Sequence, residues 1–344
     1  MRRWTRWALV FASGAVLCVI AVGMAAAQPA AAPFPLGKTV TLYVGVDPGG
    51  TNDMLMRLVA RHIGKYLPGN STIVAKNMPG AGGRRLATYL YSQAPRDGTE
   101  FGALQRAIST DKLIADPTLP FNPAEFTWIG SPSSTTDICL AWHATPFHSI
   151  EDLKTHEFIV AASGSSERNA FIIKQLTGFN IRSIIGYPGG TEQNLAIERG
   201  EVHGRCSLAW ESLKSSYADW IDERKIRVLL QFGFTSHPDL PGVPLISDLA
   251  ANETDRQALD ILMAPGSIGF PFAGPPGLLP EVRDMLRNAY EKVMTDPVLI
   301  EEARKVKFVL YPIRGTEIQR IVERAHAAPP QAIERAMQLG SPPK

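Results

Sequence analysis

Pro48-Gly49-Gly50-Thr51 and Pro188-Gly189-Gly190-Thr191 are the same tetrapeptide, met twice in one chain. Each copy follows an apolar run with the character of a strand (residues 40–46 and 181–187) and precedes a stretch that reads as a helix (54–66 and 193–198). A strand, a double-glycine turn and a helix start leave backbone N–H groups free at the positive end of a helix dipole. Two such turns on separate α/β units predict a cleft that holds an anionic ligand from both sides.

Along the rest of the chain, short strand-like runs alternate with helical stretches, which is typical of an α/β fold. Strands are expected at residues 39–46, 71–77, 100–105, 128–130, 138–142, 158–162, 181–187, 202–210, 227–232 and 267–272. Helices are expected at 54–66, 84–93, 167–177, 193–198, 280–294, 297–305 and 316–337, the last interrupted by Pro329-Pro330. No long linker separates the units. We therefore expect domain 1 to be discontinuous (38–137 and 235–344) around domain 2 (138–234), with hinges at 137–142 and 231–235.

The N-terminus is typical of a secretory signal peptide. Arg2, Arg3 and Arg6 precede an apolar run at 8–22, and small residues then favour cleavage after Ala27. A lipid-anchored Cys18 is a poorer alternative, since Leu17 stands where a small residue is expected. Cleavage there removes three arginines and no acidic residues, so the formal net charge falls from +2 to −1. We expect a periplasmic protein, and the near-neutral chain argues against nucleic acid as a partner.

The two remaining cysteines, Cys139 and Cys206, lie in strand-like runs. Export permits a disulfide between them. Two buried free thiols fit the sequence equally well, so the pairing stays open at this stage.

Several motifs, ordered along nearly the whole chain after residue 27, resemble those of one receptor family. They are Pro48-Gly49-Gly50-Thr51-Asn52-Asp53 with Arg57, Asn77-Met78-Pro79-Gly80-Ala81-Gly82-Gly83, Ala94-Pro95-Arg96-Asp97-Gly98-Thr99, Tyr187-Pro188-Gly189-Gly190 with Gly200-Glu201-Val202, Leu240-Pro241-Gly242-Val243-Pro244 and Ala273-Gly274-Pro275-Pro276-Gly277. The chain resembles the substrate-binding receptors of tripartite tricarboxylate transporters, the Bug-type extracytoplasmic solute receptors. The resemblance implies an α/β, two-domain periplasmic-binding-protein fold with a ligand cleft between the domains. It also implies capture of a small organic acid or amino acid, and delivery by a monomeric receptor to a membrane permease.

The sequence departs from the family pattern near the expected ligand. Asp47 brings a negative charge next to the first loop, and Arg84-Arg85 follows the second where small or apolar residues are usual. Arg106 stands in a stretch that lacks the expected small polar run. These changes leave the fold expectation intact and make the ligand class the open question.

The expected ligand-binding residues lie on five segments. They are Gly49, Gly50, Thr51 and Asn52; Gly80, Ala81 and Gly82; Arg106; Ser163, Ser165 and Ser166; and Gly189, Gly190 and Thr191. Each has a purely structural alternative: a tight turn for the glycines, a helix cap for the serines and a surface salt bridge for Arg106. Asp53 fits the first turn of a helix better than a ligand contact, because its charge stabilises the helix start and repels an anion.

No motif in the sequence predicts catalysis, a metal or a cofactor. The glycines at 80–83 lack the Gly-x-Gly-x-x-Gly spacing, and neither Pro-Gly-Gly-Thr is completed to a phosphate loop by a lysine. The seven histidines lack His-Glu-x-x-His pairing, and no Gly-x-Ser-x-Gly frame surrounds Ser163. A ligand sensor that signals to a partner protein, or a secreted α/β enzyme, are the alternative functions.

Overall fold

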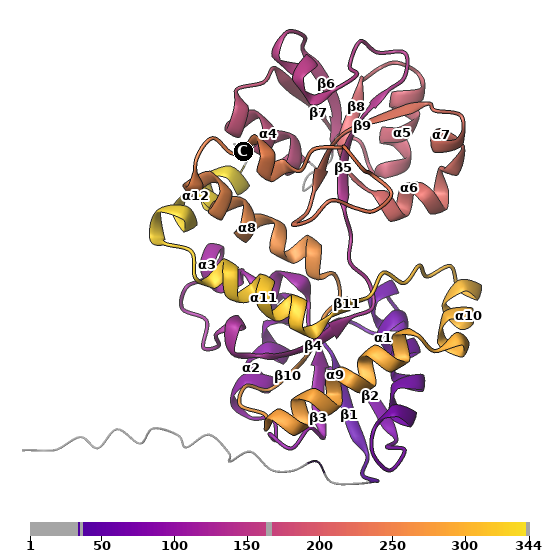
Figure 1. Ribbon diagram of the computed structural model, residues 1–344, viewed down its shortest axis with the longest axis vertical. Helices are drawn as coiled ribbons and strands as arrows, with labels where there is room; N and C mark the ends of the chain where they lie inside the picture. Colours follow the sequence, from indigo (N-terminus) through magenta and orange to yellow (C-terminus); the bar gives the residue numbers. More distant parts are fainter. Residues whose placement is uncertain (1–33, 35–36, 163–166, 342–344) are drawn as a thin grey trace, which may run out of the picture.

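The computed structural model describes residues 34, 37–162 and 167–341, and arranges them in two domains with one mixed sheet each (Figure 1). The expected signal peptide at 1–27 lies outside these residues. No helix among them is both long and apolar enough to cross a bilayer. The α/β, two-domain class expected from the sequence is confirmed.

The first sheet has six strands in the order β11-β4-β10-β3-β1-β2. Their bounds are β1 Val40–Val44, β2 Ile73–Asn77, β3 Glu100–Ala103, β4 Thr127–Ser131, β10 Phe272–Gly274 and β11 Ile313–Arg314. β1 pairs in parallel with both β2 and β3, so the carboxyl ends of these three strands share one edge. β10 and β11 return to this sheet late in the chain, which agrees with a discontinuous first domain; the exact boundaries at 137 and 235 remain a prediction.

The second sheet has five strands in the order β7-β6-β8-β5-β9. Their bounds are β5 Asp137–Trp142, β6 Phe158–Ala162, β7 Ile181–Ile185, β8 Gly204–Ala209 and β9 Ile226–Phe232. β6 is parallel to β7 and β8, whereas β5 runs antiparallel to β8 and β9. β5 follows directly from the chain that leaves the first domain, and it begins at Asp137 (Figure 1).

The helices cover both faces of each sheet. Their bounds are α1 Thr51–Ile63, α2 Arg84–Ser92, α3 Asp111–Ile114, α4 Glu167–Thr177, α5 Gly190–Glu198, α6 Trp210–Ser216, α7 Ala218–Asp222, α8 Glu253–Ile268, α9 Pro280–Met294, α10 Pro297–Lys305, α11 Gly315–His326 and α12 Pro330–Gly340. The helices expected at 167–177, 280–294 and 297–305 are confirmed to the residue. The break expected at Pro329-Pro330 is confirmed as well, because it separates α11 from α12.

The strand expected at 267–272 is wrong. α8 extends to Ile268, and β10 begins only at Phe272. The Asn252 side chain starts this helix by accepting a hydrogen bond from the Asp255 N–H group at 2.9 Å. Pro265 lies inside the last turn, where it removes one backbone donor without ending the helix, and Gly269 with φ +58° then ends it.

The alternation of side chains along the strands explains how both sheet faces are buried. Val40, Leu42 and Val44 are at most 1 % exposed and share a core with α1 and α9. Tyr43 points to the opposite face, where its ring meets Tyr89 of α2 edge-on with centroids 5.2 Å apart. Each sheet thus forms the middle layer of its own domain.

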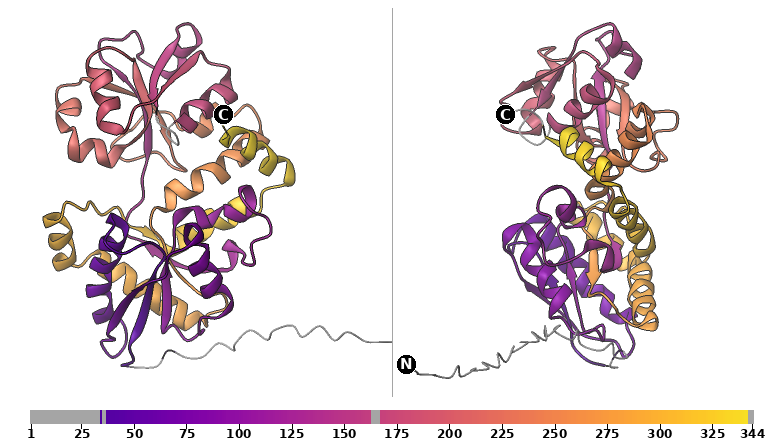
Figure 2. Two further views of the ribbon diagram at one scale, coloured as in Figure 1. Left: turned by 180° about the vertical axis from the view of Figure 1, so that it is seen from behind. Right: turned by 90° about the vertical axis from the view of Figure 1, so that its left-hand side faces the viewer.

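The two domains meet at a narrow waist beside which α8 and α12 lie (Figure 2). α12 packs against α8, against α4 of the second domain and against α3 of the first. One apolar cluster runs through all of these elements, including the fully buried Ala258, Ile173 and Leu339. These helices therefore join the domains along one side.

Cys139 of β5 and Cys206 of β8 form a disulfide, which resolves the alternative that the sequence left open. Both residues are buried, and they link neighbouring antiparallel strands. A structural disulfide of this kind fits an oxidising compartment outside the cytoplasm.

We expect the protein to lose stability as the pH falls from about 7.5 to 5.5. Burial is the main cause that lowers the pKa of His203, His237 and His326. An unfolded histidine binds a proton near pH 6.5, so below that pH protonation favours the unfolded chain. A lower Tm at pH 5.5 than at pH 7.5 checks this.

The His326→Gln variant tests this assignment more specifically, because it removes one of the buried histidines. The His326 ring lies 2.9 Å from the Ser109 carbonyl, which a glutamine amide also reaches in principle. The variant should show a shallower loss of Tm with pH, whereas His148→Gln, at an exposed histidine, should keep the slope. Equal slopes in all three proteins would contradict the assignment to buried histidines.

Candidate functional site

The first Pro-Gly-Gly-Thr forms the loop between β1 and α1. Gly49 has φ +88°, a conformation that favours glycine, and α1 begins at Thr51, three residues before the expected start. The N–H groups of Gly50, Thr51 and Asn52 have no hydrogen-bond acceptor in the described part of the chain. These three donors therefore remain available to a ligand at the N-terminus of a 13-residue helix.

Asp53 is the residue that shapes this loop. Its carboxylate accepts hydrogen bonds from the Gly49 N–H group (2.9 Å), from Arg57 Nε (2.9 Å) and from Asn77 Nδ2 (2.8 Å). Asn77 Nδ2 also donates to the carbonyl of Val46 at 2.9 Å, which ties the loop to the end of β2. The predicted structural role of Asp53 is confirmed, because its acceptor atoms are used within the fold.

The charge of Asp53 is stable despite its burial. The side chain is only 2 % exposed, and desolvation alone would raise its pKa. The hydrogen bonds from Gly49, Arg57 and Asn77 outweigh desolvation and hold the pKa below its usual value. The ionised carboxylate and Arg57 neutralise each other, so Asp53 adds no net repelling charge beside the neighbouring N–H donors.

The second glycine loop follows β2 on the same sheet edge. Gly80, Ala81, Gly82 and Gly83 all have positive φ, between 47° and 132°. The Gly83 N–H group donates to the Gly80 carbonyl at 2.9 Å, whereas Gly80, Ala81 and Gly82 are exposed. The loop is thus a tight turn that presents backbone, as expected from its glycines.

Gln105 connects this loop to the end of β3. A Cβ placed on Gly83 would lie 3.0 Å from the Gln105 side chain, so only glycine fits there without a shift. Gln105 Nε2 also donates to the Gly45 carbonyl at 3.3 Å. Arg106 follows directly, begins a short 3₁₀ helix, Arg106–Ser109, and is exposed. The predicted residues of domain 1 are therefore neighbours at the carboxyl edge of parallel strands, where open α/β sheets bind ligands.

The second Pro-Gly-Gly-Thr forms the corresponding loop of the second domain, between β7 and α5. Gly190 and Thr191 are exposed at the helix start. Beneath the loop, the guanidinium of Arg205 donates to the Gly190 carbonyl (3.2 Å), to Asn194 Oδ1 (3.0 Å) and to the Ser207 carbonyl (3.2 Å). This buried arginine fixes the loop, and no sequence motif pointed to it.

Arg205 is unusual because its charge is almost completely buried. The side chain is 5 % exposed, and burial lowers its pKa to about 10 while the charge of Asp137 acts in the opposite direction. Its Nε, the Ser207 hydroxyl and the Gln193 amide are buried polar groups without a hydrogen-bond partner among the residues that the structure describes. Such groups are rare in folded proteins, so the interior beneath this loop is unusually polar.

A cavity of about 440 Å³ lies where the two domains meet. Arg106 and Thr110 line it from the first domain, Arg168 from α4 of the second, and Asp137 from the crossing strand. Pro265 and Gly266 of α8, together with the end of α12, close its remaining side. Arg106 was expected from the sequence, whereas Arg168 and Asp137 were missed. The other predicted residues of domain 2, Ser163, Ser165 and Ser166, lie outside the described residues.

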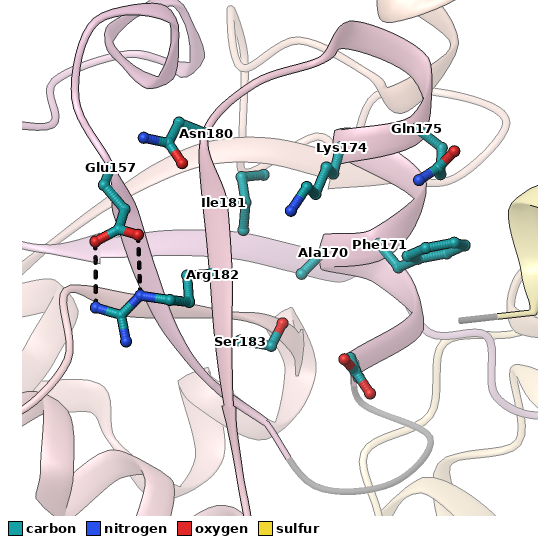
Figure 3. Close-up of a pocket in the computed structure, with 10 residues that line it drawn as sticks. Glu157, Ala170, Phe171, Lys174, Gln175, Asn180, Ile181, Arg182 and Ser183 are labelled. Carbon is teal, nitrogen blue, oxygen red and sulfur yellow. Dashed lines mark hydrogen bonds and ion pairs between the residues drawn. The ribbon is translucent and has the colours of Figure 1, made fainter. Parts of the chain in front are cut away.

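A second hollow, of about 360 Å³, lies on the outer side of the second domain between α4 and the edge strand β7 (Figure 3). Glu157 and Arg182 form an ion pair at its side, with Nε and Oε1 2.9 Å apart. None of the predicted site residues within the described ranges lines it. The interdomain cavity is therefore the better candidate, since the predicted Arg106 lines it and both domains contribute to its wall.

The chain is similar to known proteins in its structure, whereas comparisons of its sequence found no match. No family model and no curated protein matches the chain. Among solved structures, a TctC solute-binding protein from Polaromonas, without ligand, is 18 % identical with a TM-score of 0.67, over 87 % of this chain and 98 % of that one. The chain has the fold of a periplasmic solute-binding protein. The resemblance expected from the sequence motifs is thus confirmed in the fold.

A second solved structure, described as a periplasmic transporter, is less similar in its overall superposition. It is 19 % identical, with a TM-score of 0.50 over 88 % of this chain and 98 % of that chain. Both matches span nearly the whole of the solved proteins. The solute-binding fold therefore accounts for the two domains together, including the segments that return from the second domain to the first.

Proposed function

We propose that this protein is a periplasmic receptor that captures a small carboxylate between its two domains and presents it to a membrane permease. The observation that carries the proposal is the cluster of unused N–H donors at Gly50, Thr51 and Asn52, placed on the same sheet edge as the second glycine loop. The fold of a solute-binding protein and the family-like motifs at these loops support it.

The proposed mechanism is binding without chemistry. The N–H groups of residues 50–52 and of the second glycine loop take one carboxylate, which a helix N-terminus favours electrostatically. Gly190 and Thr191 approach the ligand from the second domain as the domains close about residues 137–142 and 231–235. Neutral donors hold the anion because they are preorganised by the Asp53 and Arg205 contacts.

A thermal-shift screen of mono-, di- and tricarboxylates, amino acids and aromatic acids tests the proposal. A ligand at about 100 times its Kd stabilises the folded state by roughly 2.7 kcal/mol, which is a measurable rise in Tm. At least one acid should raise Tm. A response to a sugar or a cation with none to any acid would contradict the carboxylate proposal.

Gly50→Val should abolish this response without unfolding the protein. Gly50 has ordinary backbone angles (φ −75°, ψ 165°), and a Cβ there meets nothing within 4 Å, so the variant should fold. The branched side chain would occupy the space in front of the free N–H groups. Gly178→Val, on a loop of the second domain, would strain the backbone, because Gly178 has φ +70°. The control is therefore Thr118→Val, at an exposed threonine, which should leave binding unchanged. Normal acid binding by Gly50→Val would reduce the first loop to a structural turn.

A further inference from the structure

Two arginines from different domains line the interdomain cavity. Arg106 belongs to the first domain and Arg168 to the first turn of α4 in the second, and both side chains are exposed to the cavity solvent. The volume of about 440 Å³ falls within the roughly 300–1,000 Å³ that small-molecule sites occupy. The cavity is therefore large enough for a ligand that contacts both residues.

The two acids of the cavity form their hydrogen bonds with other residues, although the charge of Asp137 also acts on Arg168. Asp111 Oδ2 accepts a hydrogen bond from Arg84 Nε at 2.9 Å. Asp137 Oδ2 lies 3.4 Å from the Asn169 amide, and its charge also acts on the buried Arg205. Neither Arg106 nor Arg168 forms an ion pair with any residue in the described ranges. Both arginines line the cavity, one from each domain.

The two cations disfavour one another. Desolvation by the surrounding protein lowers the pKa of the Arg168 guanidinium. The negative charge of Asp137 raises this pKa, whereas the positive charge of Arg106 lowers it further. Like charges on opposing domains resist closure, and an anion placed between them replaces that repulsion with two attractions. The planar guanidinium offers paired donors that match a carboxylate.

Arg106 is also close in the chain to the loops that hold the first carboxylate in the proposed function. Gln105 contacts Gly83 of the second loop and the Gly45 carbonyl at the end of β1, and Arg106 is the next residue. A short ligand could therefore reach from the free N–H groups into the cavity. Its far end would meet Arg106 and Arg168.

We infer that Arg106 and Arg168, one from each domain, jointly bind a second anionic group of the ligand, which selects dicarboxylates over monocarboxylates and favours domain closure. This inference rests on the proposed function, since it concerns the far end of the same ligand. It assigns the two arginines a role in specificity: the loops recognise any carboxylate, and the arginine pair recognises the second charge.

Isothermal titration calorimetry with linear α,ω-dicarboxylates of four to eight carbons, and with monocarboxylates of the same lengths, tests this inference. The best dicarboxylate should bind the unaltered protein at least about tenfold more tightly than its matched monocarboxylate. Arg106→Gln and Arg168→Gln should each remove that preference, mainly by weakening the dicarboxylate. Arg304→Gln, at a surface arginine that is 74 % exposed and paired with Glu301, is the matched control and should bind like the unaltered protein.

The outcomes separate the inference from the proposed function. Carboxylate binding by the unaltered protein with the same preference in both glutamine variants would overturn the inference and leave the receptor proposal standing. No binding of any of these acids would overturn both. Far-UV circular dichroism melts of each variant establish that a loss of binding is not a loss of fold, because both side chains are exposed and their replacement should change Tm little.

Discussion

Removing the Cys139–Cys206 disulfide is expected to lower the free energy of unfolding by about 4 kcal/mol. The bond closes a loop with a sequence separation of 67 residues, and the chain-entropy model assigns about that stabilisation to a loop of this size. Urea unfolding with and without a reductant measures it, as does the double variant Cys139→Ala, Cys206→Ala. Both the reductant and the double variant should shift the unfolding midpoint to a lower urea concentration.

Loss of this bond should also weaken ligand binding. Cys206 follows Arg205, and Cys139 lies two residues after Asp137, so the disulfide holds together the strands that carry these two charged groups. Adding reductant to the double alanine variant is the control and should change nothing. Two titratable thiols in the denatured, unreduced protein would contradict the disulfide itself.

Replacing Asp53 by alanine is expected to cost about 3 kcal/mol and to abolish carboxylate binding. The substitution strands the Gly49 N–H group, the Arg57 guanidinium and the Asn77 amide, all of which donate to this carboxylate. Breaking a buried ion pair typically costs about 3–5 kcal/mol, and the lower end applies because Arg57 is 38 % exposed and can turn to solvent. Chemical denaturation and calorimetry with the best acid from the screen give the two readouts.

Two further variants separate the fold effect from the binding effect. Asp53→Asn keeps one acceptor oxygen but loses the charge, so it should recover part of the stability and little of the binding. Asp284→Asn removes an exposed carboxylate paired with its neighbour Arg283, and should be neutral in both measurements. Full binding by Asp53→Ala would show that the first loop does not depend on this network.

Much of the fold was predictable because it depends on local signals. Alternating apolar residues define the strands, and Pro280 and Pro297 stand at helix starts, so the bounds of α9 and α10 were correct. α8 was not predicted from the sequence, and its last turn holds Pro265 and Gly266, two residue types that disfavour a helix. Proline in the last turn of a helix costs little when tertiary packing holds that turn, and the sequence alone does not show that packing.

The candidate site could be predicted from the sequence only where backbone groups of the glycine loops form it. Glycines at strand ends marked the three glycine loops, because positive φ and close approach leave a signature in residue type. Asp137, Arg168 and Arg205 carried none: they are far apart in sequence, and the pairing of β5 with β8 and the packing of α4 on β8 bring them together. The disulfide was unpredictable for the same reason, since it depends on the antiparallel pairing of β5 with β8. Arg106 was recognised only as a departure from a family pattern.

Native mass spectrometry of the purified protein, before and after exchange against a mixture of organic acids, tests most directly whether it captures a carboxylate. A complex of one protein with one acid is expected, which dissociates on denaturation and is absent from Gly50→Val. A complex with a sugar or a cation, or a protein that stays free in the presence of saturating acids, would contradict it.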